Sequence, residues 1–373
     1  MRLAVVVEQC LAPVPGGTGR YTRELAAALA GTAPAGATVT GWTAWHRRPG
    51  AATVPGVRGP RRLPLPRRAL VAAWERGLGP APADADVVHA PTPLAPPRRR
   101  VPLVVTIHDA VPWTHPETLT ARGVAWHRRA AAYAARAADA VVVPTAAVAG
   151  ELSGVLPGLD PDRLHVVGEG ATEALAASPP DAAARLARLA LPAGGFLLSL
   201  STLEPRKGLD VLLAALADRA APALPLAVVG QAGWGGVDPR AEAARLGLPP
   251  DRVRVLGGLD DADLAAVLHA AVALVAPSRA EGFGLPVLEA MAAGVPAVTS
   301  DAPALVEVGG GATLVVPRDD PPALAAALRS VVEDAALRDR LRSAGPRRAA
   351  EFSWTRAAGA LWTVYAKLGV RPA

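Results

Sequence analysis

Residues 280–291 combine two carboxylates with two glycines in the order AEGFGLPVLEAM. They follow a strand-like run at 273–276, and Pro286 suits the first turn of a helix, so the pattern predicts a loop that leads into a helix. Gly282 and Gly284 allow a ligand to approach the backbone closely, and the free N–H groups of a helix start favour an anion such as phosphate. Glu281 and Glu289 are suited to accept hydrogen bonds from sugar or ribose hydroxyls. A helix cap followed by an exposed glutamate is the competing interpretation.

A second chemically specific turn, residues 202–208, reads TLEPRKG and follows a predicted strand at 196–199. Arg206 can bind phosphate oxygens with a bidentate fork, and Lys207 adds a compact ammonium charge. The chain has one other lysine, Lys367, and arginine supplies the remaining positive charge, so a lysine here argues against a merely solvated turn. The two cations predict a diphosphate site that needs no metal ion.

The dipeptide His108-Asp109 ends a strongly β-forming run at 103–108. A histidine at a strand end can donate to a substrate oxygen, and Asp109 can orient the loop. Such a pair is more often structural, so it decides nothing by itself.

A glycine-rich segment, Gly16-Gly17-Thr18-Gly19, separates the first predicted strand (3–7) from a helix predicted at 20–30. It is superficially like the glycine fingerprint of dinucleotide-binding folds, but the spacing differs and residues 8–15 intervene. We interpret it as a backbone loop that contacts an acceptor or a donor phosphate.

These motifs lie at the ends of short apolar runs that alternate with Ala-, Arg- and Leu-rich helical patterns, which predicts parallel sheets of the doubly wound α/β class. The pattern lapses between 170 and 192, so we expect two domains, 1–175 and 190–353. Segment 31–66 contains a strand-like piece at 38–44, but its elements cannot be assigned. The predicted strands are 3–7, 86–89, 103–108, 140–143, 164–167, 196–199, 226–229, 252–256, 273–276, 297–299 and 313–315.

Composition narrows the class of protein. The chain has 373 residues, 51% of them hydrophobic, and a formal net charge of +6. Cys10 is the only cysteine, which excludes an internal disulfide and a cysteine-based zinc cluster and fits a reducing compartment. The N-terminal apolar run is too short for a signal peptide, and no run reaches the length that spans a bilayer. We therefore expect a cytoplasmic protein.

Taken together, these motifs resemble the retaining glycosyltransferases of the group 1, glycogen-synthase-like family. The likeness spans nearly the whole chain and is most specific over residues 195–317. The resemblance implies the GT-B architecture, in which two Rossmann-like domains face each other across a cleft. The first carries mainly the acceptor and the second mainly the donor, and a C-terminal helix, here 354–373, crosses back to the first domain.

The resemblance also implies roles for the motif residues. Glu289 would hold the ribose, and Arg206 and Lys207 the diphosphate. Glu281 would contact the hydroxyls of the transferred sugar, and His108 would lie near the reacting sugar, so these two are the expected catalytic residues. The other expected donor contacts are Gly17, Ser201, Gly282, Phe283, Gly284 and Leu285.

Within the family, the turn at 202–207 and the motif that begins at His108 look most like a bacterial mannosyltransferase branch. GDP-mannose is therefore the first expected donor, with a glycan or lipid-linked acceptor and no bound cofactor or metal. The chain departs from relatives at three points. Ser201 lies where they often carry a phosphate-binding arginine, Pro144-Thr145 replaces a common Val-Ser, and 168–170 (GEG) replaces a Pro-Asn-Gly turn.

Other functions stay open at this point. A GT-B enzyme that uses a UDP-sugar is the main alternative, and a noncatalytic nucleotide-sugar-binding protein comes from a different class. A dinucleotide oxidoreductase is disfavoured by the incomplete glycine fingerprint, and nucleic-acid binding has no support beyond net charge. The arginines at 61–68, 98–100 and 128–129 suggest, on charge alone, peripheral contact with an anionic lipid-linked acceptor at the inner face of the membrane.

Overall fold

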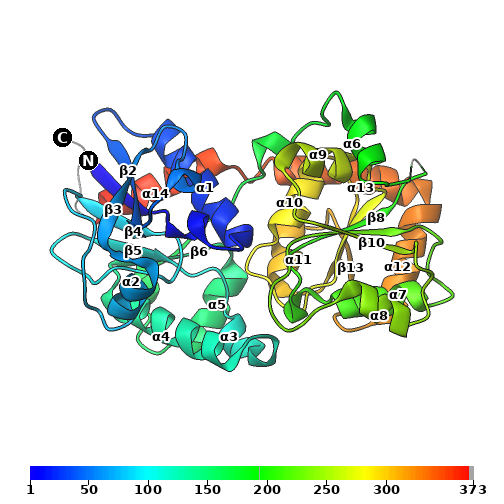
Figure 1. Cartoon of the computed structure of the whole chain (residues 1–373), viewed down its shortest axis with the longest axis horizontal. Coiled ribbons are helices and arrows are strands. Elements are labelled where there is room, and N and C mark those ends of the chain that lie inside the picture. The colour runs from blue at the N-terminus through cyan, green and yellow to red at the C-terminus, as the bar shows by residue number, and fades with distance from the viewer. Residues whose placement is uncertain (193, 369–373) are drawn as a thin grey trace. The chain divides into compact units, whose positions relative to one another are not determined.

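The computed structural model describes residues 1–192 and 194–368, which fold into two compact α/β units (Figure 1). Unit 1 comprises Met1–Thr114, Ala121–Gly170 and the C-terminal segment that begins at Ser353. Unit 2 comprises His115–Thr120 and Ala171–Phe352. The chain enters unit 2 briefly at His115–Thr120 and passes into its main part after Gly170, while the bounds 1–175 and 190–353 stay a prediction. Residues 369–373 of the predicted C-terminal segment lie outside the described residues.

Unit 1 is built on a parallel sheet in the order β3-β2-β1-β4-β5-β6-β7. Strands β4, β5 and β6 are buried at every residue, as expected for parallel strands covered on both faces. The strands are β1 (Arg2–Val6), β2 (Thr38–Trp45), β3 (Arg58–Pro66), β4 (Val87–Ala90), β5 (Leu103–Thr106), β6 (Ala140–Val143) and β7 (Leu164–Val166). The helices are α1 (Gly16–Gly31), α2 (Arg67–Trp74), α3 (Val111–Thr114), α4 (Ala121–Ala137), α5 (Ala146–Val155) and α14 (Trp354–Lys367).

Unit 2 is built on a second parallel sheet in the order β10-β9-β8-β11-β12-β13. The two sheets confirm the predicted doubly wound α/β class. The strands are β8 (Leu197–Leu200), β9 (Leu226–Val229), β10 (Val253–Gly257), β11 (Ala273–Ala276), β12 (Ala297–Ser300) and β13 (Leu314–Val316). The helices are α6 (Ala182–Arg188), α7 (Leu209–Ala217), α8 (Pro239–Arg245), α9 (Asp261–Ala270), α10 (Leu285–Ala292), α11 (Pro303–Gly309), α12 (Pro321–Glu333) and α13 (Ala335–Ala349).

Helix α14 packs against α1 within unit 1, although it comes from the far end of the chain (Figure 1). Ser353 caps its start by accepting a hydrogen bond from the Arg356 N–H. Tyr365, which is fully buried, donates to or accepts from His89 Nδ1 on β4 at 2.7 Å. The helix is therefore part of the core of unit 1.

The structure assigns the elements of one open segment and moves the start of one predicted helix. Segment 31–66 contains β2, which matches the strand-like piece at 38–44, and the edge strand β3, whose prolines are tolerated because an edge strand has one unpaired side. Helix α1 begins at Gly16 rather than residue 20, so Gly17 lies in its first turn and not in a preceding loop. Glycine lowers the helical signal of a sequence, but the first turn needs no intrahelical N–H partners. Within residues 1–192 and 194–368, every helix is too short or too polar to span a bilayer.

Candidate active site

The turn at 204–207 follows β8 and is fixed by the residue after it. Pro205–Lys207 form one short 3-10 turn, and Gly208 then adopts a left-handed conformation with φ 65°. A Cβ at Gly208 would overlap the backbone carbonyl of Pro277, which follows β11. Because β8 and β11 are neighbours in the sheet, this close approach brings the cationic turn to the segment that carries Glu281.

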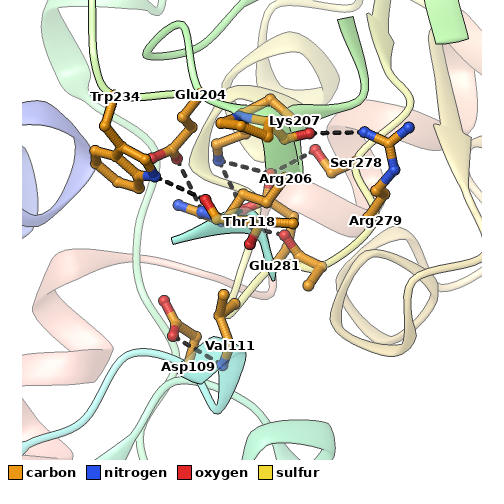
Figure 2. Close-up of polar contacts among 12 residues, drawn as sticks. Asp109, Val111, Thr118, Glu204, Arg206, Lys207, Trp234, Ser278, Arg279 and Glu281 are labelled. Carbon is orange, nitrogen blue, oxygen red and sulfur yellow. Dashed lines mark hydrogen bonds and ion pairs between the residues drawn. The ribbon is translucent and has the colours of Figure 1, made fainter. Parts of the chain in front are cut away.

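Glu281 is the centre of a charged hydrogen-bond network in unit 2 (Figure 2). Its carboxylate accepts from Lys207 Nζ at 2.7 and 2.9 Å and from an Arg206 terminal nitrogen at 3.0 Å. The Ser278 hydroxyl donates to the same carboxylate at 2.7 Å. On its other side, Arg206 Nε forms an ion pair with Glu204 at 2.8 Å. The predicted cations and the predicted loop glutamate therefore form one cluster.

Burial sets the electrostatics of this cluster, because the Glu281 side chain is only 10% exposed. Burial alone would raise the pKa of Glu281, but the charges of Lys207 and Arg206 and the hydrogen bonds from Lys207 and Ser278 outweigh it and lower the pKa to about 2. The carboxylate thus stays ionised at neutral pH. It holds both cations in place at the carboxyl edge of the sheet, where open α/β folds bind ligands.

The glycine loop at 282–285 presents its backbone rather than its side chains. Phe283 is buried and packs edge-on against Phe352 at 5.6 Å between ring centroids, and Leu285 is also buried. Gly284 has φ 97°, and a Cβ there would come 2.5 Å from a Leu305 methyl carbon. It precedes α10, which has no side-chain cap at its start. This geometry leaves the backbone as the part of the loop that can contact an anion.

Two further predicted residues of unit 2 are Ser201, which lies near this network, and Glu289. A small cavity is lined by Ser201, Lys207, Glu281 and Gly284, among others. Glu289, on α10, is buried, and its carboxylate accepts a hydrogen bond from the Thr172 hydroxyl at 2.8 Å. Thr172 comes from a segment in which the sequence showed no recognisable motif.

His108 lies in unit 1, two residues after β5. Its Nε2 donates to the Pro91 carbonyl at 2.8 Å, and its Nδ1 lies 3.8 Å from a carboxylate oxygen of Glu169. The Tyr21 ring packs edge-on against the imidazole at 4.6 Å between centroids. Glu169 belongs to the 168–170 turn that departs from the family pattern, so the departure places a buried carboxylate beside His108. The Asp109 carboxylate accepts from the Val111 N–H at 3.1 Å and so orients the loop.

The Tyr21 hydroxyl belongs to a buried network of polar side chains. Thr106 Oγ lies 3.3 Å from the Tyr21 hydroxyl and 2.9 Å from His89 Nε2, and His89 Nδ1 contacts Tyr365. Burial and the nearby His108 lower the pKa of His89 to about 3, so this histidine is neutral. Its role is to join β4, β5, α1 and α14 rather than to carry charge.

Gly17 is exposed, and a Cβ added to it would meet no heavy atom of unit 1 within 4 Å. Neither packing nor a positive φ requires glycine at this position. By contrast, a Cβ at Gly19 would overlap the Pro15 ring. Gly17 therefore leaves open space at the start of α1.

Unit 2 brings together five parts of the predicted site: Ser201, Arg206, Lys207, Glu281 and the glycine loop. Gly17 and His108 belong to unit 1. Glu204 and Ser278 are not among the predicted site residues, although Glu204 lies in the 202–208 motif. Residue 169 was predicted only as part of a turn that departs from the family pattern, without a link to His108.

Two family models match consecutive parts of the chain. "Glycosyltransferase Family 4" matches residues 15–173, and "Glycosyl transferases group 1" matches residues 188–348. Together they cover most of each unit, but not residues 1–14 or helix α14.

The curated relatives also have the names of glycosyltransferases, but the substrates or products in these names differ. The D-inositol 3-phosphate glycosyltransferase 1 of Catenulispora acidiphila is 33% identical over 81% of this chain and 76% of its own length. The O-antigen chain mannosyltransferase B of Escherichia coli is 36% identical over 48% of this chain, which spans about half (47%) of that relative. The glycogen synthase of Mycobacterium tuberculosis is 41% identical over 47% of this chain and 44% of its own length.

Solved structures match over nearly the full length. Sucrose-phosphate synthase from Thermosynechococcus elongatus superposes with a TM-score of 0.76 at 24% identity, covering 99% of both chains. The Anabaena protein HepE in complex with UDP-glucose superposes with a TM-score of 0.73 at 20% identity, covering 98% of this chain and 100% of its own. These likenesses show a shared fold.

Proposed function

Because this chain belongs to the glycosyltransferase group 1 family and has the GT-B fold, we propose that it transfers mannose from GDP-mannose to a hydroxyl of a glycan or lipid-linked acceptor. The transfer would retain the α configuration and use no metal ion. The observation that carries the proposal is the Glu281 network, which holds Lys207 and Arg206 at the carboxyl ends of β8 and β11.

In this proposal, Lys207 and Arg206 stabilise the negative charge that develops on the leaving diphosphate, and the backbone at 282–285 adds N–H dipoles. The bond between the anomeric carbon and the diphosphate oxygen breaks. The acceptor oxygen forms its bond to the same carbon on the same face, and its proton passes to the leaving phosphate. Glu281 accepts from the sugar hydroxyls, and Glu289 from the ribose.

His108 and Gly17 are the proposed ligand contacts of unit 1. The His108 Nε2 proton is committed to the Pro91 carbonyl, so Nδ1 is the atom left to face a substrate or Glu169. Gly17 offers the N–H groups of the first turn of α1 to a donor phosphate or an acceptor.

The identity of the nucleotide-sugar donor is the most specific part of the proposal. The name of the Escherichia coli relative supports mannose, while the glycogen synthase relative and the UDP-glucose complex of HepE keep a UDP-sugar as the second candidate. The test is a screen of GDP-mannose, UDP-glucose and ADP-glucose for hydrolysis and transfer. Faster turnover of a UDP-sugar than of GDP-mannose would refute the donor assignment.

The same screen tests the site. Lys207→Ala and Glu281→Ala should each lose most donor hydrolysis, whereas Arg254→Ala, an arginine of β10 outside the network, should retain it. Undiminished turnover in both site variants would overturn the assignment. Absence of hydrolysis and transfer with every donor, despite nucleotide-sugar binding, would favour a noncatalytic binding protein.

We also propose a cytoplasmic enzyme that contacts the membrane peripherally through arginines of unit 1 and binds no nucleic acid. Several of these arginines are engaged within the fold, since Arg61 stacks on the Trp42 ring and Arg98 pairs with Asp139. The remaining exposed candidates include Arg62, Arg68 and Arg100. Replacing these three by serine should release the protein from anionic liposomes, and unchanged liposome binding would refute the contact.

A further inference from the structure

Three ionisable side chains from separate segments meet at the carboxyl edge of the unit 1 sheet. Glu8 follows β1, His46 follows β2, and Arg67 begins α2 directly after β3. These three strands are neighbours in the sheet, so their ends lie together. The cluster lies outside the motifs discussed above.

The buried carboxylate of Glu8 contacts both of the other side chains in the cluster. Its side chain is 1% exposed, and its carboxylate accepts from the Ala44 N–H at 2.8 Å and from His46 Nε2 at 2.9 and 3.1 Å. Arg67 Nε lies 3.6 Å from the same carboxylate. A buried carboxylate is costly to desolvate, so its value lies in fixing the orientation of the two groups it holds.

Arg67 is held only at its Nε, and its side chain is 34% exposed. Across residues 1–192 and 194–368, no hydrogen bond or ion pair is recorded for its two terminal nitrogens. His46 is 24% exposed beside it. An oriented guanidinium with open terminal nitrogens matches a phosphate group, which it can bind in a bidentate fork.

The surroundings carry an excess of positive charge. Arg47 and Arg48 follow His46, and Arg68 follows Arg67; all three are exposed and form no recorded ion pair with the described residues. The first turn of α2 contains no acidic residue and has no side-chain cap, so its two arginines sit at the positive end of the helix dipole. The helix dipole favours acidic residues at this end and disfavours the two arginines, and a bound anion would offset this repulsion.

We propose that Arg67 and His46, held by Glu8, form an acceptor subsite that recognises a phosphate group, so that the acceptor is a phosphorylated compound. This deepens the proposed transferase function and rests on it. The phosphate could belong to a free phosphorylated acceptor or to a lipid headgroup, since both present the same chemistry.

The direct test measures inorganic phosphate binding by calorimetry in a Lys207→Ala background, which removes a donor-site cation. Arg67→Gln should weaken phosphate binding about tenfold or more, the loss expected for a charge-assisted contact. The matched control Arg122→Gln changes an exposed arginine in the first turn of α4, in the same unit, and should bind phosphate normally. Equal affinity in the two variants would overturn the proposal, and circular dichroism checks that both are folded.

Two further arms separate the phosphate sources and the two proposals. If glycerol phosphate competes with inorganic phosphate for binding, the acceptor is a free phosphorylated compound. If the protein floats with vesicles that contain phosphatidic acid but not with vesicles that contain phosphatidylserine, the phosphate belongs to a lipid headgroup. Absence of both competition and flotation overturns the subsite. Donor hydrolysis without acceptor is measured in the chain without substitutions and in the control Arg122→Gln, and it should be the same in both. If the chain hydrolyses no donor, the proposed function fails, whereas the phosphate titration still decides the subsite.

Discussion

Replacing Gly17 with alanine should raise stability and lower activity at the same time. A Cβ at this position meets no atom of unit 1, and the residue is helical, so alanine should stabilise unit 1 by about 0.5 kcal/mol through its better helix propensity. For a unit of this size that corresponds to a rise in Tm of about 1–2 °C. The same methyl group would occupy the space through which a donor phosphate or acceptor reaches the helix start. Loss of one such N–H contact should lower kcat/KM about tenfold or more.

The assay combines calorimetric unfolding with donor hydrolysis and transfer. The matched control is Gly31→Ala, at the last residue of the same helix, where a Cβ also meets open space. It should give a similar gain in Tm with unchanged activity. Full activity in Gly17→Ala together with the expected Tm gain would refute the role of this glycine in ligand binding. A drop in Tm would refute the packing argument.

Three other changes test the network in unit 2. The pKa of Glu281 is about 2, against an ordinary value of 4.5, so the ionised carboxylate stabilises the fold by about 3 kcal/mol above pH 4.5. This stabilisation is lost as the pH falls toward 2. Glu281→Gln should therefore flatten the pH dependence of the unfolding free energy between pH 4.5 and 2, and an unchanged slope would contradict this. Gly208→Ala should cost about 1–3 kcal/mol and reduce donor hydrolysis, because φ is positive and the Cβ overlaps a backbone carbonyl. The control Gly236→Ala has a similar φ of 67° but open space, so equal losses in the two would contradict the overlap argument. Thr172→Val should lower thermal stability by removing the hydrogen bond to Glu289, about 1–3 kcal/mol, whereas Thr172→Ser should retain it; equal unfolding midpoints would show that the bond contributes little.

Much of the fold was predictable because its central strands are short, almost entirely buried and rich in apolar residues. Strands β4, β5, β6 and β11 fall at or close to the predicted runs. β3 could not be predicted, because its prolines and arginines are acceptable only at the edge of a sheet, and the order of strands is not written in local sequence. The start of α1 was missed for a similar reason, since its first-turn glycines read as a loop.

The candidate site was predictable where a motif is contiguous. Lys207 and Glu281 were singled out from their own turns, and the direct bonds between them follow from the pairing of β8 with β11. Pairs such as His108 with Glu169, or Glu8 with His46, join residues from separate strand ends, so no spacing in the sequence reveals them. For His108 and Glu169, the departure of the 168–170 turn from the family pattern was the one indication in the sequence.

The origin of α14 has a consequence for how the protein is made on the ribosome. Most of unit 1 is synthesised before unit 2, yet Tyr365 and Leu361, which fill its interior, are synthesised after unit 2. All of unit 2 therefore leaves the exit tunnel before unit 1 can close over His89. Unit 1 is thus completed after unit 2, and nascent chains stalled before residue 353 should present an incomplete unit 1 to chaperones and proteases.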